Sequence, residues 1–198
     1  AEDMIVVANG RGAAHIGVLE VRTRETNFAP AKNFFVSRVK QNFLRQSYLG
    51  AIWTNGDPAL SGSANTFGTD VLLATSNFLG RDRNFRAGAF AVKSRNEGVS
   101  GDDATFGFGA EYPNDLFSAE VVWHQAGKNF RPALGFAPRT NVRYLEAGFE
   151  YKPRPKRFLN VRQMFHEFFY DRYTRLDTGQ VESWRLFTAP INWTFNSG

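Results

Sequence analysis

The 198-residue chain contains no cysteine, which excludes a disulfide framework and a thiolate-ligated metal site. It also has no apolar run near the roughly 18 residues that a membrane-spanning helix requires, so it is not a helical membrane protein. The first ten residues, AEDMIVVANG, lack a basic segment followed by an apolar one and therefore show no signal peptide. We expect the sequence to begin in a mature or internal part of a longer chain.

Clustered charge is missing as well. The net charge is +5, but lysine and arginine are scattered, whereas a nucleic-acid-binding domain concentrates them in a stripe. We therefore expect no nucleic-acid partner. The three histidines, His15, His124 and His166, lie far apart without metal-site spacing, so we predict neither a metal nor another cofactor.

Alternating, aromatic sequence is abundant, and residues 104–125 show it most clearly. On both sides of the turn-forming segment Pro113–Asp115, apolar side chains occupy every second position: Phe106, Phe108, Ala110, Tyr112, Phe117, Ala119, Val121 and Trp123. Successive side chains on a strand point to opposite faces, so each arm has one apolar, mostly aromatic face. The segment is predicted to form a β-hairpin.

The rest of the chain divides into similar runs between turn-rich segments, and no run has a convincing helical period. The further strands are expected at 4–8, 14–25, 34–40, 46–54, 67–75, 85–94, 142–152, 157–173 and 181–195. Asn9-Gly10 is predicted to be a hairpin turn. We predict one all-β domain over residues 1–198, with about ten antiparallel strands in up-and-down order.

The connections alternate in length. Those at 26–33, 55–66, 95–103 and 126–141 are long, and those at 41–45, 113–115 and 153–156 are short. Short turns at one end and longer loops at the other are typical of an outer-membrane barrel, and several runs match the nine to eleven residues of a tilted membrane-crossing strand. We therefore predict a transmembrane β-barrel that is part of a larger one, with Pro113–Asp115 as a periplasmic turn.

The alternation assigns residues to two faces. Apolar side chains and interfacial aromatic residues are expected to face lipid: Phe106, Phe108, Tyr112, Trp123, Phe149, Tyr151 and Trp193. Lumen-facing positions are expected at Glu111, Glu120, His124, Glu146, Glu150 and Arg162, with His166 beside them. These groups either select a polar solute or pair with one another inside a plugged barrel.

Two other features bear on function. The loop 126–141 holds Arg131, Phe136 and Arg139 among Pro and Gly, and it is predicted either to bind a ligand or partner or to fold into the lumen as a plug. Pairs of glutamates are also the catalytic groups of glycoside hydrolases, but that reaction needs a defined distance between the two carboxylates, which the sequence does not determine. We expect no enzyme.

Two long segments carry a family resemblance. Asn33–Asn55, with SRVK followed by RQSYLGAI, and Asp115–Pro155, with the NFRPALGF loop and Arg139, resemble the barrel region of an uncharacterised bacterial family of outer-membrane β-barrel proteins. GDD before FGFGAEYPNDL also matches, and the resemblance extends over roughly 13–195. Full-length members carry an N-terminal family-nine-type carbohydrate-binding module, which this chain lacks.

The resemblance implies a barrel fragment in the outer membrane of a Gram-negative-type bacterium. Its partners would be the lipid bilayer and, through the attached module, carbohydrate or other envelope proteins. We predict a pore, a conduit or a membrane anchor linked to carbohydrate binding or uptake. Two alternatives stay open: a soluble antiparallel barrel that binds an apolar ligand against its aromatic face, and a structural platform that binds partners in an envelope assembly.

Overall fold

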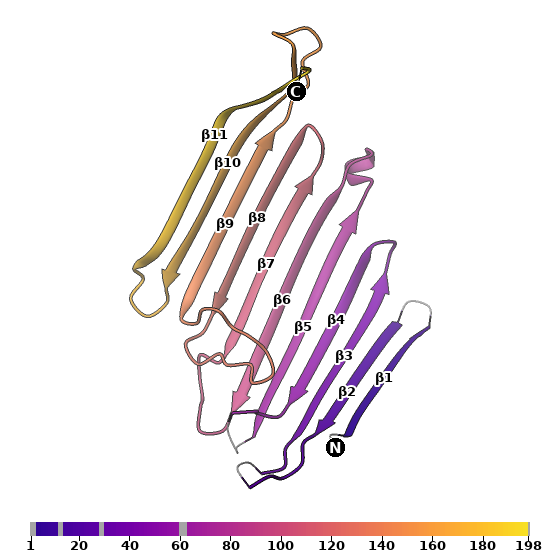
Figure 1. Ribbon diagram of the computed structural model, residues 1–198, viewed down its shortest axis with the longest axis vertical. Helices are drawn as coiled ribbons and strands as arrows, with labels where there is room; N and C mark the ends of the chain where they lie inside the picture. Colours follow the sequence, from indigo (N-terminus) through magenta and orange to yellow (C-terminus); the bar gives the residue numbers. More distant parts are fainter. Residues whose placement is uncertain (1–2, 12–13, 28–29, 60–62, 198) are drawn as a thin grey trace.

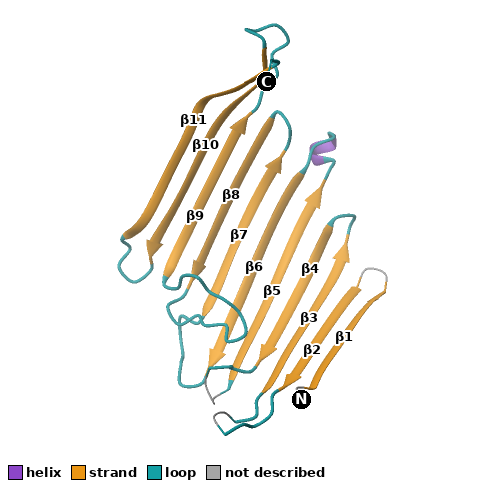
Figure 2. Ribbon diagram, viewed as in Figure 1, coloured by secondary structure: helices purple, strands orange, loops and turns teal. Residues whose placement is uncertain are grey.

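The computed structural model describes residues 3–11, 14–27, 30–59 and 63–197. These residues form one antiparallel sheet whose eleven strands follow each other in chain order (Figure 1). Helix is confined to a single 3-10 turn in this part of the chain, η1 (Phe78–Gly80), as Figure 2 shows. No described helix has the length and apolar character needed to cross a membrane.

Every strand pairs with the one before it and the one after it. The strands are β1 (Asp3–Arg11), β2 (Ala14–Arg22), β3 (Asn33–Phe43), β4 (Ser47–Asn55), β5 (Ala64–Thr75), β6 (Phe85–Asn96), β7 (Ala104–Pro113), β8 (Phe117–Ala126), β9 (Val142–Tyr151), β10 (Val161–Arg175) and β11 (Val181–Phe195). The predicted all-β, up-and-down antiparallel arrangement is confirmed. The sheet is open, however: β1 and β11 are its two edges, so closure into a barrel is not part of this structure.

Two predicted connections differ from the structure. Asn9 and Gly10 do not form a turn but continue the β1–β2 ladder opposite Ile16 and His15, because the ladder hydrogen bonds outweigh a local turn preference. Residues 12–13, between the two strands, lie outside the described residues. The connection predicted as short at 153–156 extends over 152–160, where Leu159 and Asn160 adopt positive φ angles of 46° and 56°.

Because directly opposed residues share a face, the register assigns the strand positions to two surfaces. The apolar face is the one that carries Phe108, Trp123 and Leu145 opposite one another on β7, β8 and β9. Its large side chains stay exposed: Ile16, Val39, Leu49, Trp53, Phe67, Leu73, Phe106, Phe108, Phe117, Val121, Leu145, Phe149, Phe168, Trp184 and Leu186.

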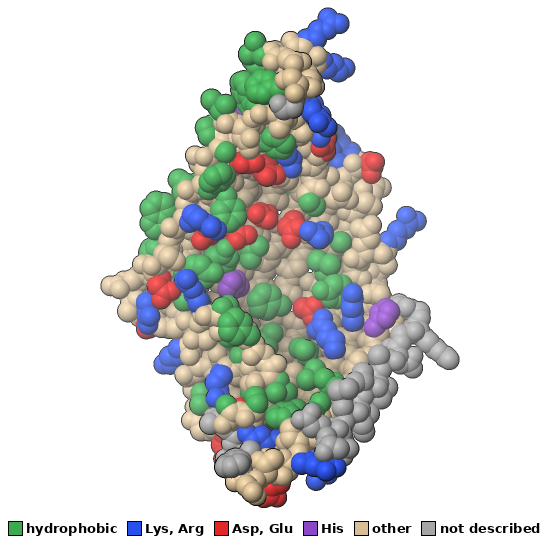
Figure 3. Space-filling view, viewed as in Figure 1, with side chains coloured by type: hydrophobic (Ala, Val, Ile, Leu, Met, Phe, Trp, Pro, Cys, Tyr) green, Lys and Arg blue, Asp and Glu red, His purple; other side chains and the backbone are tan. Residues whose placement is uncertain are grey.

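The polar face is the opposite surface, which carries most of the charged strand residues. Figure 3 shows acidic and basic side chains gathered across the sheet, with hydrophobic ones between them. The buried hydrophobic residues of the described chain lie at strand ends or in loops: Ala64, Ala126, Phe130, Val142 and Val161. Neither face of the sheet is therefore covered by a second layer.

Close strand packing at Gly107 generates a stability prediction. A Cβ atom at this position would lie 2.5 Å from the Cβ of His124 and 2.6 Å from the carbonyl oxygen of Trp123. We expect Gly107→Ala to force β7 and β8 apart and to lower the free energy of unfolding by about 1–3 kcal/mol. Urea unfolding followed by tryptophan fluorescence measures this.

Gly17→Ala is the matched control, because a Cβ at Gly17 meets no atom within 4 Å. Its urea midpoint should stay near that of the unmodified chain. Equal midpoints for the two variants would contradict the packing argument.

Candidate functional site

Carboxylates from four neighbouring strands gather on the polar face. Glu111 on β7 lies opposite Glu120 on β8, and Glu150 on β9 lies opposite Glu167 on β10. The register adds two more in the next row, where Glu146 lies opposite Asp171. The antiparallel ladder thus brings into one area acidic residues that lie as many as 60 positions apart in the chain.

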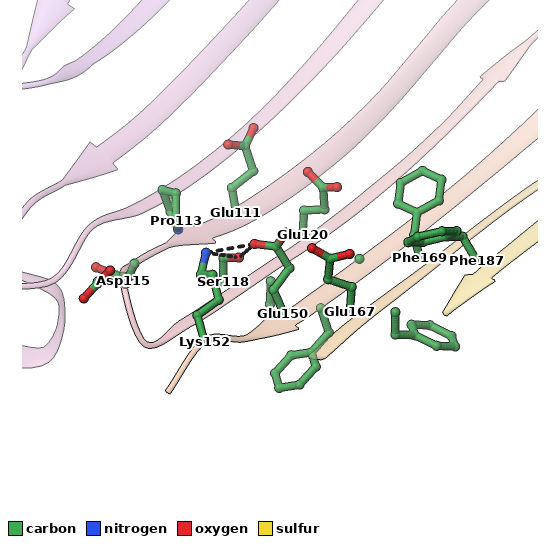
Figure 4. A pocket seen from close by; sticks show the side chains of 15 residues that line it. Glu111, Pro113, Asp115, Ser118, Glu120, Glu150, Lys152, Glu167, Phe169 and Phe187 are labelled. Carbon is green, nitrogen blue, oxygen red and sulfur yellow. Dashed lines mark hydrogen bonds and ion pairs between the residues drawn. The ribbon is translucent and has the colours of Figure 1, made fainter. Parts of the chain in front are cut away.

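These strands surround a hollow of about 810 Å³. Its lining includes Glu111, Glu120, Glu150, Glu167, Lys152, Phe169 and Phe187 (Figure 4). The carboxylates lie on one side of the labelled group and the two phenyl rings on the other. The site therefore combines negative charge with an aromatic wall.

Most of the carboxylates have a partner. Glu150 accepts hydrogen bonds from Ser118 Oγ at 2.5 Å and from Lys152 Nζ at 2.8 Å, as the dashed lines of Figure 4 mark. Asp171 pairs with Arg185 through Oδ2 and Nε at 2.7 Å.

Two further carboxylates are held by neighbours on the same face. Glu111 pairs with Arg86, and Glu146 accepts a hydrogen bond from the Tyr144 hydroxyl. These partners fix the orientation of the side chains that line the acidic area.

Glu120 differs from these groups, since its side chain makes no ion pair or hydrogen bond with the described residues. It lies over Gly148 on β9: a Cβ at that glycine would be only 2.9 Å from Glu120 Oε1. The absence of a side chain at Gly148 leaves room for the carboxylate, which stays available to solvent or to a solute.

The polar face also carries two basic side chains on β3, Arg38 and Lys40. Arg38 Nη1 and Asp70 Oδ1 are 2.6 Å apart, and Lys40 Nζ lies 4.1 Å from the centre of the Tyr48 ring. A Cβ at Gly50 would collide with this ion pair, 2.4 Å from Arg38 Nη2. Most carboxylates of the polar face thus lie on β7–β10, beside their basic partners Arg86, Lys152 and Arg185, while Arg38 and Lys40 lie on β3.

The register places the predicted lumen residues Glu111, Glu120, His124, Glu146 and Glu150 together on the polar face. Arg162 lies at a bulge between Val161 and Gln163, so the ladder assigns it to neither face. The placement of His166 beside the lumen residues was wrong. It lies opposite Tyr151, on the apolar face, because it alternates with Glu167.

The residues predicted to face lipid share the apolar face through the same ladder: Phe106, Phe108, Tyr112, Trp123, Phe149, Tyr151 and, opposite Met164, Trp193. Several aromatic rings lie near strand ends. Tyr151 stacks on Phe117 at 4.8 Å, and Trp193 meets Phe158 edge-on at 5.9 Å.

The loop residues Arg131, Phe136 and Arg139 are not brought together as one binding cluster. Arg131 pairs with Asp57 at 2.7 Å, while the guanidinium carbon of Arg139 lies 4.2 Å from the centre of the Tyr173 ring. Phe136 is 86% exposed. Arg131 is therefore tied to the β4–β5 loop and Arg139 to β10.

Residues 127–141, here called the strap, return over the polar face. The backbone N–H of Arg131 donates to Ser94 Oγ at 2.9 Å, and Asn96 Nδ2 donates to the carbonyl of Arg131 at 3.0 Å. Ser94 is itself fixed, since its N–H donates to the carbonyl of Asp103 at 2.9 Å. The strap thus rests on the polar-face end of β6.

Sequence reasoning missed Glu167, Phe169 and Phe187 of the hollow and Asp57 beneath the strap. The first two follow from the alternation of β10, which also sets the face of Asp171. Asp57 had no such signal, because it lies in a loop 74 positions from Arg131. No group of three or more His, Cys, Asp or Glu in the described chain could hold a metal ion.

Comparisons with protein-family models, curated proteins and solved structures gave no match to this chain. The site is therefore interpreted from its own geometry.

A pH prediction follows from Asp103, a buried loop residue whose carboxylate lies 2.9 Å from Lys93 Nζ. The hydrogen bond from Lys93 holds the pKa of Asp103 below its usual range. Because the folded pKa is the lower one, the ion pair stabilises the fold above the unfolded value of about 4, and this contribution is lost as pH falls through the folded pKa.

We expect Asp103→Asn to lower the urea midpoint at pH 6, and we expect the difference from the unmodified chain to shrink between pH 4 and 2.5. Asp82→Asn is the control, since this exposed carboxylate makes no ion pair with the described residues. A difference for Asp103→Asn that stays constant with pH would contradict the assignment.

Proposed function

We propose that this chain forms part of the wall of an outer-membrane β-barrel that conducts polar solutes, with the apolar face toward lipid and the polar face toward a water-filled lumen. The observation that carries the proposal is the segregation of exposed side chains. Trp53, Phe108 and Leu186 are 40%, 54% and 51% exposed on one face, while the acidic area occupies the other. Soluble monomers rarely expose contiguous apolar surface on this scale.

Strand length agrees with this proposal, and loop length agrees with it in part. The strands from β2 to β9 extend over nine to twelve residues, close to what a tilted strand needs to cross the hydrocarbon core. Connections 23–32, 56–63, 97–103 and 127–141 lie at one end of the sheet, together with the short turn 176–180. The other end has the tight turns 44–46 and 114–116 and two connections of nine residues, 76–84 and 152–160. We take the end that carries the strap-length connection 127–141 as external and the end with the tightest turns as periplasmic.

The chemistry of the polar face supports a lumen. Its ion pairs and tyrosine hydroxyls are groups that a wet interior accommodates, whereas hydrocarbon would penalise them by several kcal/mol each. Unpaired Glu120 and the aromatic wall of Phe169 and Phe187 offer contacts to a passing polar solute. Carbohydrate is the solute class that the family resemblance suggests.

Tryptophan quenching tests which face meets lipid. All four tryptophans, Trp53, Trp123, Trp184 and Trp193, lie on the apolar face. We expect a variant that keeps only Trp123, with the other three changed to Phe, to be strongly quenched in vesicles of lipids brominated on their acyl chains. Fluorescence against matched non-brominated vesicles measures this.

The control is a tryptophan on the other face. Phe169→Trp in a chain whose four native tryptophans are changed to Phe should be quenched by aqueous iodide and little by brominated lipid. A Trp123 that brominated lipid leaves unquenched, in a chain that stays monomeric without detergent, would instead support the soluble barrel with an apolar ligand.

Two adjacent valines on β8 allow the face assignment to be tested with the same substitution on each face. Val121 lies on the apolar face and Val122 on the polar face. We expect Val121→Arg to reduce the stability of the vesicle-inserted protein by about 2–4 kcal/mol, the cost of arginine facing lipid near mid-membrane, and Val122→Arg to cost much less. Urea titration in vesicles measures both, and equal losses would contradict the assignment.

A further inference from the structure

We infer that the strap, residues 127–141, narrows the lumen from inside and sets the upper size of the solutes that pass. This inference rests on the proposed conduit. A loop that merely crowned the barrel would extend away from the sheet, whereas the strap is attached to groups of the polar face. Figure 2 shows the connection between β8 and β9 reaching sideways past the ends of β7 and β6.

The strap begins with a close backbone contact. A Cβ at Gly127 would lie 2.1 Å from the carbonyl oxygen of Asp102, so no other residue fits there without moving the chain. Gly127 N–H donates to the carbonyl of Ala104 at 2.9 Å, and Asn129 N–H donates to that of Asp102 at 2.9 Å. The start of the strap is thus joined to the loop before β7.

The second attachment is Arg131. Its side chain reaches Asp57, whose carboxylate is 4% exposed, and its backbone is held by Ser94 and Asn96. Removing one partner of a charged, largely buried contact lowers the stability of the fold more than removing one partner of an exposed ion pair. Arg131 therefore ties the strap both to β6 and to the loop before β5.

The third attachment lies on the same polar face, at the β10–β11 edge of the sheet. Arg139 stacks over Tyr173 of β10, and its Nη1 is 3.5 Å from Glu182 Oε2 on β11. Tyr173 in turn contacts Tyr144 at 4.5 Å. The strap thus has contacts from the β4–β5 loop to β11.

Between these attachments the strap curves around a hollow of about 400 Å³. Strap residues such as Phe130 and Phe136 line most of it, together with Asn96 at the end of β6 and Val99 in the β6–β7 loop. Phe130 is buried against this region, while Phe136 stays exposed. A segment that is fixed to the polar face at three places and curves around its own hollow takes up part of the lumen cross-section, which is the property required of a constriction.

The first experiment tests the attachment, whether or not the barrel conducts. Because the chain lacks cysteine, Ser94→Cys supplies a single thiol beneath Arg131. In the folded, detergent-solubilised protein we expect slow labelling by a polyethylene glycol maleimide. Adding Arg131→Ala should raise the labelling rate roughly tenfold, as expected for the loss of one charged contact.

The control is Arg45→Ala in the same Ser94→Cys chain, because it removes an equal charge from the tight turn at the opposite end of the sheet. It should leave the labelling rate unchanged. A rate that Arg131→Ala also leaves unchanged would overturn the inference.

The second experiment tests the constriction in planar bilayers. One variant is Arg131→Ala, and the other replaces residues 128–140 by a four-residue Gly-Ser turn, which suffices to join the adjacent strands β8 and β9. We expect both to raise single-channel conductance and to admit larger polyethylene glycols than the unmodified channel admits.

Faster labelling without a change in conductance or polymer size would overturn the constriction while leaving the conduit intact. No conductance in any variant, with Trp123 still quenched by brominated lipid, would show a membrane-embedded wall without a conduit. That result would reject the proposed function, and the constriction with it.

Discussion

The antiparallel ladder is the constraint on which every other feature of this sheet depends. It holds ten strand pairs in continuous register, apart from the bulges between β10 and β11. Since side chains alternate with a period of two, one slip would exchange the two faces of a strand. The segregation of Phe108 and Trp123 from Glu111 and Glu120 is therefore a property of the register rather than of any single contact.

Glycines let charged groups share the polar face without separating the strands. Gly50 leaves space for the ion pair of Arg38 and Asp70, and Gly148 leaves space for Glu120. Removing a side chain at the position opposite a large one keeps both the ladder bonds and the charged group. The glycines of the polar face thus determine which neighbouring positions can hold a charged side chain.

Alternation within a strand allowed much of this structure to be predicted. It gave the strands, their order and the common face of Glu111, His124 and Glu146 from the sequence, because neighbours in a hairpin are close in the chain. The contact of Arg131 with Asp57 could not be predicted, since it joins two loops without periodicity across 74 positions. The turn predicted at Asn9-Gly10 was wrong for a related reason. A dipeptide indicates only a local backbone preference, and the hydrogen bonds of the β1–β2 ladder override it.

The number of strands has a consequence for how such a wall can close. With eleven strands that alternate in direction, β1 and β11 run the same way. If these two edges paired directly, β1 and β11 would form a parallel pair in an otherwise antiparallel barrel. If two copies related by a rotation about the barrel axis closed the barrel together, β11 of each copy would pair with β1 of the other, and the barrel would contain two parallel pairs. A closed wall that is antiparallel throughout requires an odd number of strands between β11 and β1, which gives the even total found in bacterial single-chain barrels.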